Sequence, residues 1–407
     1  MRHTLSFRIV LLTTTLMLAV AANAQDDERL LQQARELVQS ALIVDTHIDV
    51  PYRIHAQWAD VTAATDDGDF DAPRARAGGL NAPFMSIYLP WHSEHDGTAT
   101  ALANALIDQV EAIAARDPAQ FSMAYSSADV RQAFRDGKIA LPLGMENGAA
   151  IQGDLDLLRH FYQRGIRYIT LTHSRANHIA DSSYDPVPMW QGLSPFGREL
   201  VAAMNDLGMI VDISHVSDAA FYEALEISRA PLVATHSSVR HFTPGFERNM
   251  SDAMIQALAA KGGIIMINFG SSFLTAQANQ WQQKFSAARD NLRSQLGIDD
   301  DDDPRVQAFT AAYRSKHAYP YATVADVADH IDHVVKLVGI DHVGIGSDYD
   351  GVGDSLPTGL KDVSSYPNMV AELLRRDYSA ADIRQVLGEN FMRVWAQIEA
   401  MADQPND

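Results

Sequence analysis

Side chains that can bind metal ions or transfer protons stand at the ends of six short apolar runs of the sequence. These residues are His47, Asp49, Glu146, His173, His215, His236 and Asp348. Imidazole nitrogens and carboxylate oxygens bind zinc, manganese and iron, and they also act as general acids and bases. A single histidine after an apolar run is more often structural. The same pattern at six runs predicts one common site.

Two pairs of these residues have a spacing that suits a metal ion. His47 and Asp49 are two residues apart at the end of an extended segment, so their side chains point the same way. His215 and His236 end adjacent runs and could hold a second ion, and Glu146 offers two oxygens that could bridge both ions. Because the chain has no cysteine, nitrogen and oxygen ligands favour zinc, with manganese or iron as alternatives.

The chemistry that this set predicts is hydrolysis of an amide, an ester or a lactone. Two bridged ions share a water and lower its pKa, which supplies a hydroxide at neutral pH while one ion polarises a carbonyl. Asp348 is not required as a ligand in this arrangement. It can therefore accept the proton of the water and pass it to a leaving amine. His173 is expected to stabilise the oxyanion of the tetrahedral intermediate.

The elements that must position these side chains alternate between apolar runs and helical patterns. The runs are largely continuous, as in parallel strands that are covered on both faces. Eight such runs lie at 42–44 (extended to Thr46), 83–89, 139–145, 168–171, 209–213, 232–234, 263–267 and 343–345. Helical patterns lie between most of them, at 98–115, 155–164, 195–207, 218–228, 251–260 and 324–338.

This alternation predicts an α/β fold, a (β/α)8 TIM-type barrel whose strand ends converge on one face. A doubly wound open sheet is the alternative, and it would place ligands at a switch point instead. The segment 273–318 is interpreted as a helical insertion before the last barrel strand, which could form a lid or an oligomer contact. Residues 25–407 are predicted to form one domain.

Composition and charge exclude several classes of function. The 47% hydrophobic and 21% charged residues are typical of a folded protein. A formal net charge of −20 argues against binding to nucleic acid or to an anionic membrane surface. The absence of cysteine excludes disulfides, thiol nucleophiles and thiolate zinc sites. Five aspartates at 299–303 are interpreted as a solvated loop, because a calcium site needs spaced ligands and a turn glycine.

Residues 1–24 have the pattern of a secretory signal peptide. Arg2 and Arg8 precede an apolar run at 9–20, and a small-x-small sequence follows at 22–24. The run is shorter than the about 20 residues that span a bilayer, which disfavours the alternative of an uncleaved anchor. We expect an exported protein, periplasmic or secreted, without a membrane anchor after cleavage.

The sequence resembles the renal (membrane) dipeptidase family of the amidohydrolase superfamily from about Asp45 to Trp395. The resemblance rests on short blocks that are weak individually and specific in their order and spacing. They are the H-x-D block at 44–49, the block around Glu146 at 144–148, the L-T-H block at 169–173, and the blocks at 192–197, 212–217, 228–231, 235–238, 248–250, 268–269, 344–351, 366–376 and 388–391.

The resemblance implies a homodimeric enzyme with two zinc ions per subunit that hydrolyses small dipeptides, including L-Xaa-D-Xaa dipeptides. The implied zinc ligands are His47, Asp49, Glu146, His215 and His236. The resemblance also implies that His173 contacts the scissile carbonyl and that Asp348 is the proton shuttle. Arg248, which the residues alone would not single out, is implied to bind the C-terminal carboxylate through its planar fork.

The sequence departs from the family pattern in two places. Thr46 and Ile48 stand where many members carry glycine and asparagine, so we expect altered surroundings of the metal ions without loss of ligation. Residues 270–272 are Gly-Ser-Ser where a mammalian-type enzyme carries an aromatic residue and asparagines. Because of this departure and the insertion at 273–318, the resemblance does not define which residues form the pocket for the substrate side chain.

Two alternative functions remain at this point. A related amidohydrolase acting on N-acyl amino acids or lactones is one alternative, although such branches more often use H-x-H and a bridging lysine where Asp49 and Glu146 stand here. A barrel that binds ligands without catalysis is the other. The loss of a ligand or of Asp348 would mark such a barrel, and all of these residues are present.

Overall fold

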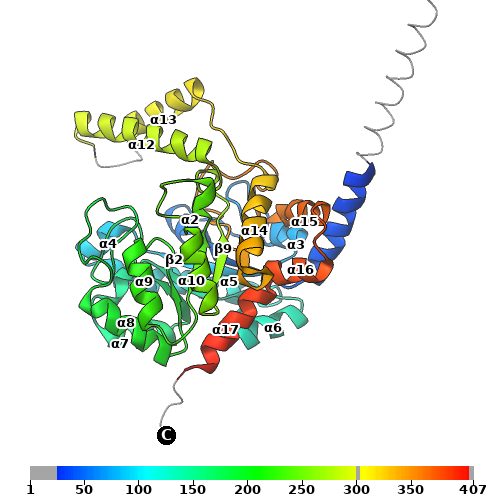
Figure 1. Cartoon of the computed structure of the whole chain (residues 1–407), viewed down its shortest axis with the longest axis horizontal. Helices are drawn as coiled ribbons and strands as arrows, with labels where there is room; N and C mark the ends of the chain where they lie inside the picture. Colours follow the sequence, from blue (N-terminus) through cyan, green and yellow to red (C-terminus); the bar gives the residue numbers. More distant parts are fainter. Residues whose placement is uncertain (1–24, 299–302, 403–407) are drawn as a thin grey trace, which may run out of the picture.

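The computed structural model describes residues 25–298 and 303–402, and these form an α/β barrel surrounded by helices (Figure 1). Eight parallel strands close in the order β1-β10-β9-β8-β7-β6-β5-β2. Their bounds are β1 (Ile43–Ile48), β2 (Leu80–Tyr88), β5 (Leu143–Glu146), β6 (Ile166–Thr170), β7 (Ile210–Asp212), β8 (Val233–Ser237), β9 (Ile264–Ile267) and β10 (Val343–Ile345). The predicted TIM-type barrel is confirmed. The open doubly wound sheet is wrong, because β1 pairs with β10 and closes the ring.

One predicted strand is divided in the structure. The apolar run at 139–145 forms β4 (Ile139–Leu141) and β5, with Pro142 between them. Proline lacks the N–H that a strand interior needs for its ladder, so the run does not continue as one strand. β4 pairs with β3 (Phe121–Met123) in a separate two-stranded sheet, while β5 belongs to the barrel.

The helices connect the strands and cover the outside of the barrel (Figure 1). Besides a helix over 25–40, they are α2 (Val50–Ala56), α3 (Ala72–Gly78), α4 (Trp91–His95), α5 (Ala99–Arg116), α6 (Ser127–Arg135), α7 (Leu155–Gln163), α8 (Pro195–Asp206), α9 (Asp218–Ile227), α10 (Asp252–Ala260), α11 (Ser271–Leu274), α12 (Ala276–Leu296), α13 (Pro304–Lys316), α14 (Val324–Val338), α15 (Tyr366–Arg375), α16 (Ala380–Arg384) and α17 (Asn390–Ala400). Short 3-10 or π turns lie at Gly148–Ile151, Arg240–Phe242, Ile340–His342, Val363–Ser365 and Gln385–Glu389. Among the described residues, no helix has the length and apolar character needed to cross a membrane.

The six predicted helices correspond to α5, α7, α8, α9, α10 and α14, and each begins and ends within one residue of its predicted range. Local capping explains several of these starts. The hydroxyls of Ser194, Ser217 and Ser251 accept hydrogen bonds from the first turns of α8, α9 and α10. Such N-caps satisfy backbone donors that have no partner inside the helix.

The insertion between β9 and α14 is helical, as predicted, and consists of α11, α12 and α13. Figure 1 shows α12 and α13 side by side at one end of the barrel. Aromatic rings join the two helices: the Tyr313 ring lies 5.4 Å from Trp281 and 5.3 Å from Phe285 between centroids. The Trp281 indole also donates a hydrogen bond to the backbone carbonyl of His317 at 3.0 Å. These contacts hold α12 in one orientation.

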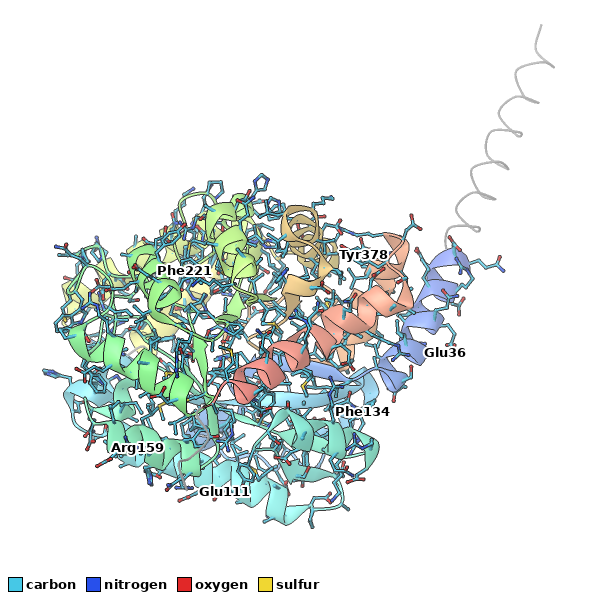
Figure 2. All side chains as sticks on the ribbon, turned by 60° about the horizontal axis from the view of Figure 1, so that its bottom comes forward. Glu36, Glu111, Phe134, Arg159, Phe221 and Tyr378 are labelled. Atoms are coloured by element: carbon cyan, nitrogen blue, oxygen red, sulfur yellow. The ribbon has the colours of Figure 1, made fainter. Side chains whose placement is uncertain are left out.

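Aromatic side chains fill the barrel interior at the end opposite the predicted site. The Phe84 ring lies 5.5 Å from Tyr168 and 5.1 Å from Trp395 of α17 between centroids. Figure 2 shows α17, in red, across this end of the barrel. Gly144 makes room for the Tyr168 ring, because a Cβ at this position would lie 1.9 Å from the ring. The phenol of Tyr168 can therefore extend from the core toward the opposite end.

His330 of α14 is fully buried and joins two loops at the site end. Its Nδ1 accepts a hydrogen bond from the Val239 N–H at 3.0 Å, so its Nε2 carries the proton and donates to the Leu274 carbonyl at 2.9 Å. Burial lowers the pKa of His330 to about 4, although the carbonyl of Leu274 acts in the opposite direction. The imidazole is therefore neutral in the folded protein at physiological pH.

We expect His330 to make the free energy of unfolding depend on pH between about 6.5 and 4. The unfolded chain takes up a proton below a pKa near 6.5, whereas the folded protein does so only near 4. Stability is therefore lost as the pH falls through this window, by roughly 3 kcal/mol in total. Denaturant unfolding at several pH values should show a shallower pH dependence for His330→Gln than for wild type. The exposed control His95→Gln should retain the wild-type slope, and equal slopes for all three proteins would contradict the assignment.

Candidate active site

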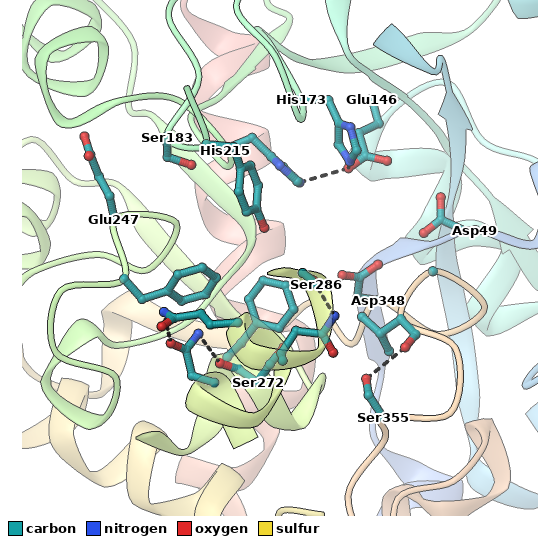
Figure 3. A pocket seen from close by; sticks show the side chains of 18 of the residues that line it. Asp49, Glu146, His173, Ser183, His215, Glu247, Ser272, Ser286, Asp348 and Ser355 are labelled. Atoms are coloured by element: carbon teal, nitrogen blue, oxygen red, sulfur yellow. Dashed lines mark hydrogen bonds and ion pairs between the residues drawn. The ribbon is translucent and has the colours of Figure 1, made fainter. Parts of the chain in front are cut away.

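The predicted site residues surround one cavity at the carboxyl ends of the barrel strands. The cavity has a volume of about 850 Å³ (Figure 3). The predicted site residues that line it are Asp49, Glu146, His173, His215 and Asp348. His47 and His236 are fully buried, and both contact Glu146. The barrel thus brings together residues that are up to 301 positions apart in the sequence, from His47 to Asp348.

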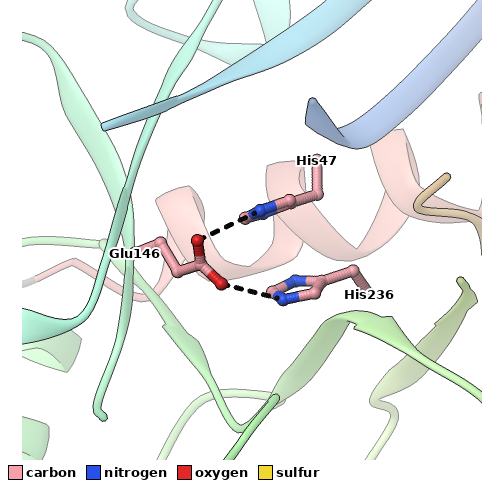
Figure 4. A group of neighbouring side chains, drawn as sticks. All are labelled: His47, Glu146 and His236. Atoms are coloured by element: carbon pink, nitrogen blue, oxygen red, sulfur yellow. Dashed lines mark ion pairs between the residues drawn. The ribbon is translucent and has the colours of Figure 1, made fainter. Parts of the chain in front are cut away.

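Glu146, at the end of β5, lies at the centre of this group. Its Oε2 lies 3.5 Å from His47 Nε2, and its Oε1 lies 3.2 Å from His236 Nε2 (Figure 4). The same Oε1 lies 3.1 Å from His215 Nε2, and Asp49 Oδ2 lies 3.5 Å from His47 Nε2. One oxygen of the carboxylate therefore faces His47, and the other faces His215 and His236.

The donor atoms fit divalent metal ions. His47 Nε2 and Asp49 Oδ1 are buried and have no hydrogen-bond partner within the described part of the chain, which is rare for buried polar atoms. One ligand atom from each of His47, Glu146 and His236 lies within 4.8 Å of the others, and the same holds for two groups that include further residues of the site, His47 with Asp49 and Asp348, and Glu146 with His173 and His215. Nitrogen and oxygen donors at this density suit zinc, manganese or iron.

Hydrogen bonds on the far side of each imidazole orient the metal-binding nitrogens. The Nδ1 of His47 is hydrogen-bonded to the Tyr168 hydroxyl at 2.8 Å. The Nδ1 of His236 lies 2.8 Å from the Thr235 hydroxyl, which itself donates to Asp212 at 2.6 Å. Because Thr235 gives its proton to Asp212, His236 donates from Nδ1 and keeps Nε2 free. The Nε2 atoms of His47 and His236 thus both face Glu146, and the Nε2 of His236 has its lone pair available.

Asp212 and Asp45 are supporting residues that the sequence reasoning missed. Asp212 is fully buried and accepts hydrogen bonds from the hydroxyls of Thr170 and Thr235 and from two backbone amides. Asp45 is also fully buried, and it accepts from the Tyr366 hydroxyl and from the backbone of His47. Aspartate is depleted in strands, so an aspartate inside an apolar run just before a predicted ligand was the available signal.

Removal of the Thr235 hydroxyl is expected to weaken metal binding. Thr235→Val keeps the shape of the side chain but leaves the Nδ1 of His236 without its acceptor. Such outer partners are worth about 10–100-fold in metal affinity. Thr170→Val is a matched control, because it also removes a hydroxyl from Asp212 but does not touch His236. Titration with a competing chelator measures both variants, and equal losses would contradict the proposed chain of hydrogen bonds.

The backbone is strained at several residues of the site. His215 and Asp348 have φ angles of 69° and 65°, and Asn147 has a φ of 72°. A residue with a Cβ in this left-handed region costs roughly 1–2 kcal/mol. The conformation of Asp348 is held by its own N–H, which donates to the His47 carbonyl at 3.0 Å. Strain of this kind concentrates at functional sites, where the surrounding structure maintains it.

Asp348 and His173 occupy the wall of the cavity beside the metal-binding group. The Asn268 amide donates to Asp348 Oδ2 at 2.7 Å, which fixes the carboxylate. Burial, and then the charge of Asp49, raise the pKa of Asp348. His173 Nε2 lies 3.6 Å from Glu146 Oε1, and burial lowers the pKa of His173. Both side chains therefore face the space in which a substrate of the metal ions would lie.

Arg248 lies beside the cavity but is not part of its lining. It is buried, and it donates to the Ser237 hydroxyl at 2.7 Å and to the His236 carbonyl at 2.8 Å. Its Nε–H is buried and has no partner within the described residues. The guanidinium carbon lies 5.4 Å from the centroid of the Phe273 ring, and Phe273 lines the cavity. A buried, partly unpaired guanidinium thus lies one side chain away from the cavity.

The model of one protein family matches the chain over residues 31–407: Membrane dipeptidase (Peptidase family M19). The chain is similar to the dipeptidase tcpJ of Claviceps purpurea (strain 20.1), with 33% identity over 371 residues, which cover 88% of this chain and 77% of that protein. It is also similar to the dipeptidase verJ of Clonostachys rogersoniana, with 32% identity over 386 residues, which cover 91% of this chain and 88% of that protein.

Solved structures share the fold. The probable dipeptidase PvdM from Pseudomonas aeruginosa superposes with a TM-score of 0.79 at 30% identity, covering 92% of this chain and 100% of that one. A metallo peptidase from Rhodobacter sphaeroides, liganded with a phosphinate mimic of the dipeptide L-Ala-D-Ala, superposes with a TM-score of 0.72 at 25% identity. That match covers 88% of this chain and 99% of that one.

Proposed function

Because the chain belongs to the membrane dipeptidase family (Peptidase family M19) and is a metallo-dipeptidase, we propose that it uses two zinc ions to hydrolyse dipeptides with a free C-terminal carboxylate. The observation that carries the two-ion proposal is Glu146, whose two oxygens face His47 on one side and His215 and His236 on the other. Manganese or iron would fit the same donors. The Rhodobacter sphaeroides relative with a mimic of L-Ala-D-Ala supports L-Xaa-D-Xaa dipeptides as substrates.

In the proposed mechanism, three side chains of the cavity have separate roles: Glu146, Asp348 and His173. The site would hold two divalent ions at Glu146, His47, Asp49, His215 and His236, and these ions would supply a hydroxide at neutral pH and polarise the scissile carbonyl. Asp348, fixed by Asn268, accepts the proton of the attacking water and returns it to the leaving amine. His173 donates a hydrogen bond to the carbonyl oxygen as negative charge develops on it. The free amine of the dipeptide lies against the carboxylates of Glu146 and Asp348.

We propose that Arg248 binds the C-terminal carboxylate of the dipeptide, with its unpaired Nε–H as one donor. Arg248→Ala is then expected to raise KM for dipeptides by roughly 10–100-fold, because hydrogen bonds to charged groups contribute about 1.5–3 kcal/mol. Metal content should change far less than KM. Steady-state kinetics and metal analysis test this, together with Arg248→Lys, which keeps the charge and loses the fork. Unchanged kinetics for Arg248→Ala would contradict the role.

The decisive experiment for the proposed function combines metal analysis with a dipeptide panel of L,L and L,D stereochemistry. We expect two ions per chain, loss of activity on chelation, and turnover of dipeptides after metal is restored. N-acyl amino acids and lactones belong in the same panel, because hydrolysis of these alone would favour the related amidohydrolase function. The absence of turnover of any dipeptide by the metal-loaded protein would refute the proposal.

We further propose that residues 25–407 form one exported domain that assembles as a homodimer. The signal peptide assigned to residues 1–24 lies outside the described residues. The single closed barrel supports one domain, and the insertion α11–α13 belongs to the loop between β9 and α14. N-terminal sequencing of the protein recovered from the periplasm or medium should begin at Gln25, and light scattering should give twice the mass of the mature chain.

A further inference from the structure

The cavity extends well beyond the metal-binding group, and helix α12 forms part of its wall. The α12 residues that line the cavity are Asn279, Gln282, Gln283 and Ser286, which we call the amide face. Their spacing of i, i+3, i+4 and i+7 places them on one side of the helix. Figure 3 shows Ser286 across the cavity from Glu146 and His173. The insertion therefore contributes a continuous uncharged polar surface opposite the proposed metal ions.

The amide face contains hydrogen-bonding groups that no other described residue uses. Gln283 donates from Nε2 to Asn279 Oδ1 at 2.8 Å, and Gln282 donates from Nε2 to Ser286 Oγ at 3.3 Å. Neither glutamine carbonyl oxygen has a protein partner within the described residues. Asn279 is itself fixed, because its amide donates to the Ser272 carbonyl at 3.1 Å. The face thus presents oriented donors and acceptors toward the cavity.

Two of the charged side chains that line this part of the cavity, Arg314 and Asp350, are paired with an opposite charge. Arg314 donates to the Asp354 carboxylate at 2.5 Å and to its backbone carbonyl at 2.8 Å. Asp350 lies 3.0 Å from the guanidinium of Arg53. Glu247 accepts a hydrogen bond from the Asp218 N–H at 2.8 Å. A ligand group that reaches the amide face therefore meets hydrogen-bonding partners rather than an unmatched charge.

We propose that the amide face binds a large, uncharged side chain of the dipeptide substrate that carries amide or hydroxyl groups. The inference rests on the proposed dipeptidase function. A volume of about 850 Å³ lies within the roughly 300–1,000 Å³ of pockets that enclose drug-sized ligands, so space remains beside a dipeptide with small side chains. An apolar side chain would cover the polar groups of the face without replacing their hydrogen bonds to water. The amide face itself carries no charged residue, so an ionised side chain would find no counter-charge on it.

The test compares substrates and variants through the ratio of their kcat/KM values. One substrate series is Gln-Gly, Met-Gly, Glu-Gly and Lys-Gly, and the other carries the same residues after glycine. Methionine matches glutamine in length but lacks the amide. We expect wild type to prefer the glutamine substrate in at least one series. Gln282→Met and Gln283→Met should each lower the glutamine-to-methionine ratio by roughly two- to tenfold, as expected for the loss of one hydrogen bond.

Gln280→Met is the matched control, because Gln280 is exposed on α12 and does not line the cavity. This variant should keep the wild-type ratio. Hydrolysis of the dipeptides without a preference for glutamine in either series would overturn the inference and leave the proposed function intact. Unchanged ratios in both Gln282→Met and Gln283→Met, or a preference for the charged substrates, would also overturn it. If no dipeptide is hydrolysed, the proposed function and the inference fall together.

Discussion

Asp348→Asn is expected to lower kcat by about 10²–10⁴-fold, the contribution typical of a positioned general acid–base group. Asparagine keeps the size of the side chain and can accept the hydrogen bond that Asn268 now donates to Asp348 Oδ2. It cannot take up the proton of the attacking water. The two proposed metal ions should remain bound, because Asp348 is not among the proposed ligands His47, Asp49, Glu146, His215 and His236.

Steady-state kinetics and elemental analysis on the same preparation separate the loss of chemistry from the loss of metal. Asp350→Asn is the matched control: Asp350 also lines the cavity and also has a φ of 65°, but its carboxylate is paired with Arg53. We expect the control to change kcat by less than the Asp348 variant. A kcat for Asp348→Asn within about tenfold of wild type, below the usual effect of such a group, would exclude the proton-transfer role.

Glu146→Gln is expected to remove most of the bound metal as well as the activity. A glutamine has one carbonyl oxygen and one NH2 group. It therefore cannot place one oxygen beside His47 and a second oxygen beside His215 and His236. Burial alone would raise the pKa of Glu146, but His173 and His47 lower it, and the net pKa lies well below its usual range. The variant therefore also removes a negative charge from a buried group of imidazoles.

The expected loss of metal affinity exceeds the roughly 10–100-fold caused by changes in residues outside the ligand set. Elemental analysis should find one ion or fewer per chain, and the melting temperature should fall, because bound metal stabilises the folded state. Glu94→Gln provides a control in which a carboxylate outside the cavity lining, paired with His178, is changed in the same way. Two ions and wild-type turnover in Glu146→Gln would show that Glu146 is not a bridge.

The barrel and the gathering of histidine and carboxylate side chains at one end of it were predictable, because both leave local patterns in the sequence. The strand β9 lies within the continuous apolar run at 263–267, and the proposed ligands His215 and His236 each follow such a run after one intervening residue. The division at Pro142 was also visible in principle, since proline interrupts a strand ladder. Arg248 had no local signal, because its position beside Ser237 and the His236 carbonyl depends on the folded loop.

The supports of the metal-binding residues were not predictable because they depend on which strands are neighbours. Thr170, Asp212 and Thr235 belong to three strands, and their contact follows from the pairing of β6 with β7 and of β7 with β8. The amide face of α12 could not be predicted from the sequence for another reason. Glutamine, asparagine and serine occur around much of the helix, so its sequence shows no contrast that marks the side toward the cavity.

A substitution in the core of the barrel can have the same effect on this enzyme as a substitution at its metal-binding site. Gly144 is neither a proposed ligand nor part of the cavity lining, yet it provides the space in which the Tyr168 ring reaches His47. We expect a methyl group added at Gly144 to displace the ring, to lower the stability of the core and to weaken binding at the proposed metal site through His47. In a genetic screen, such a substitution would be classed with ligand mutations although every ligand is intact.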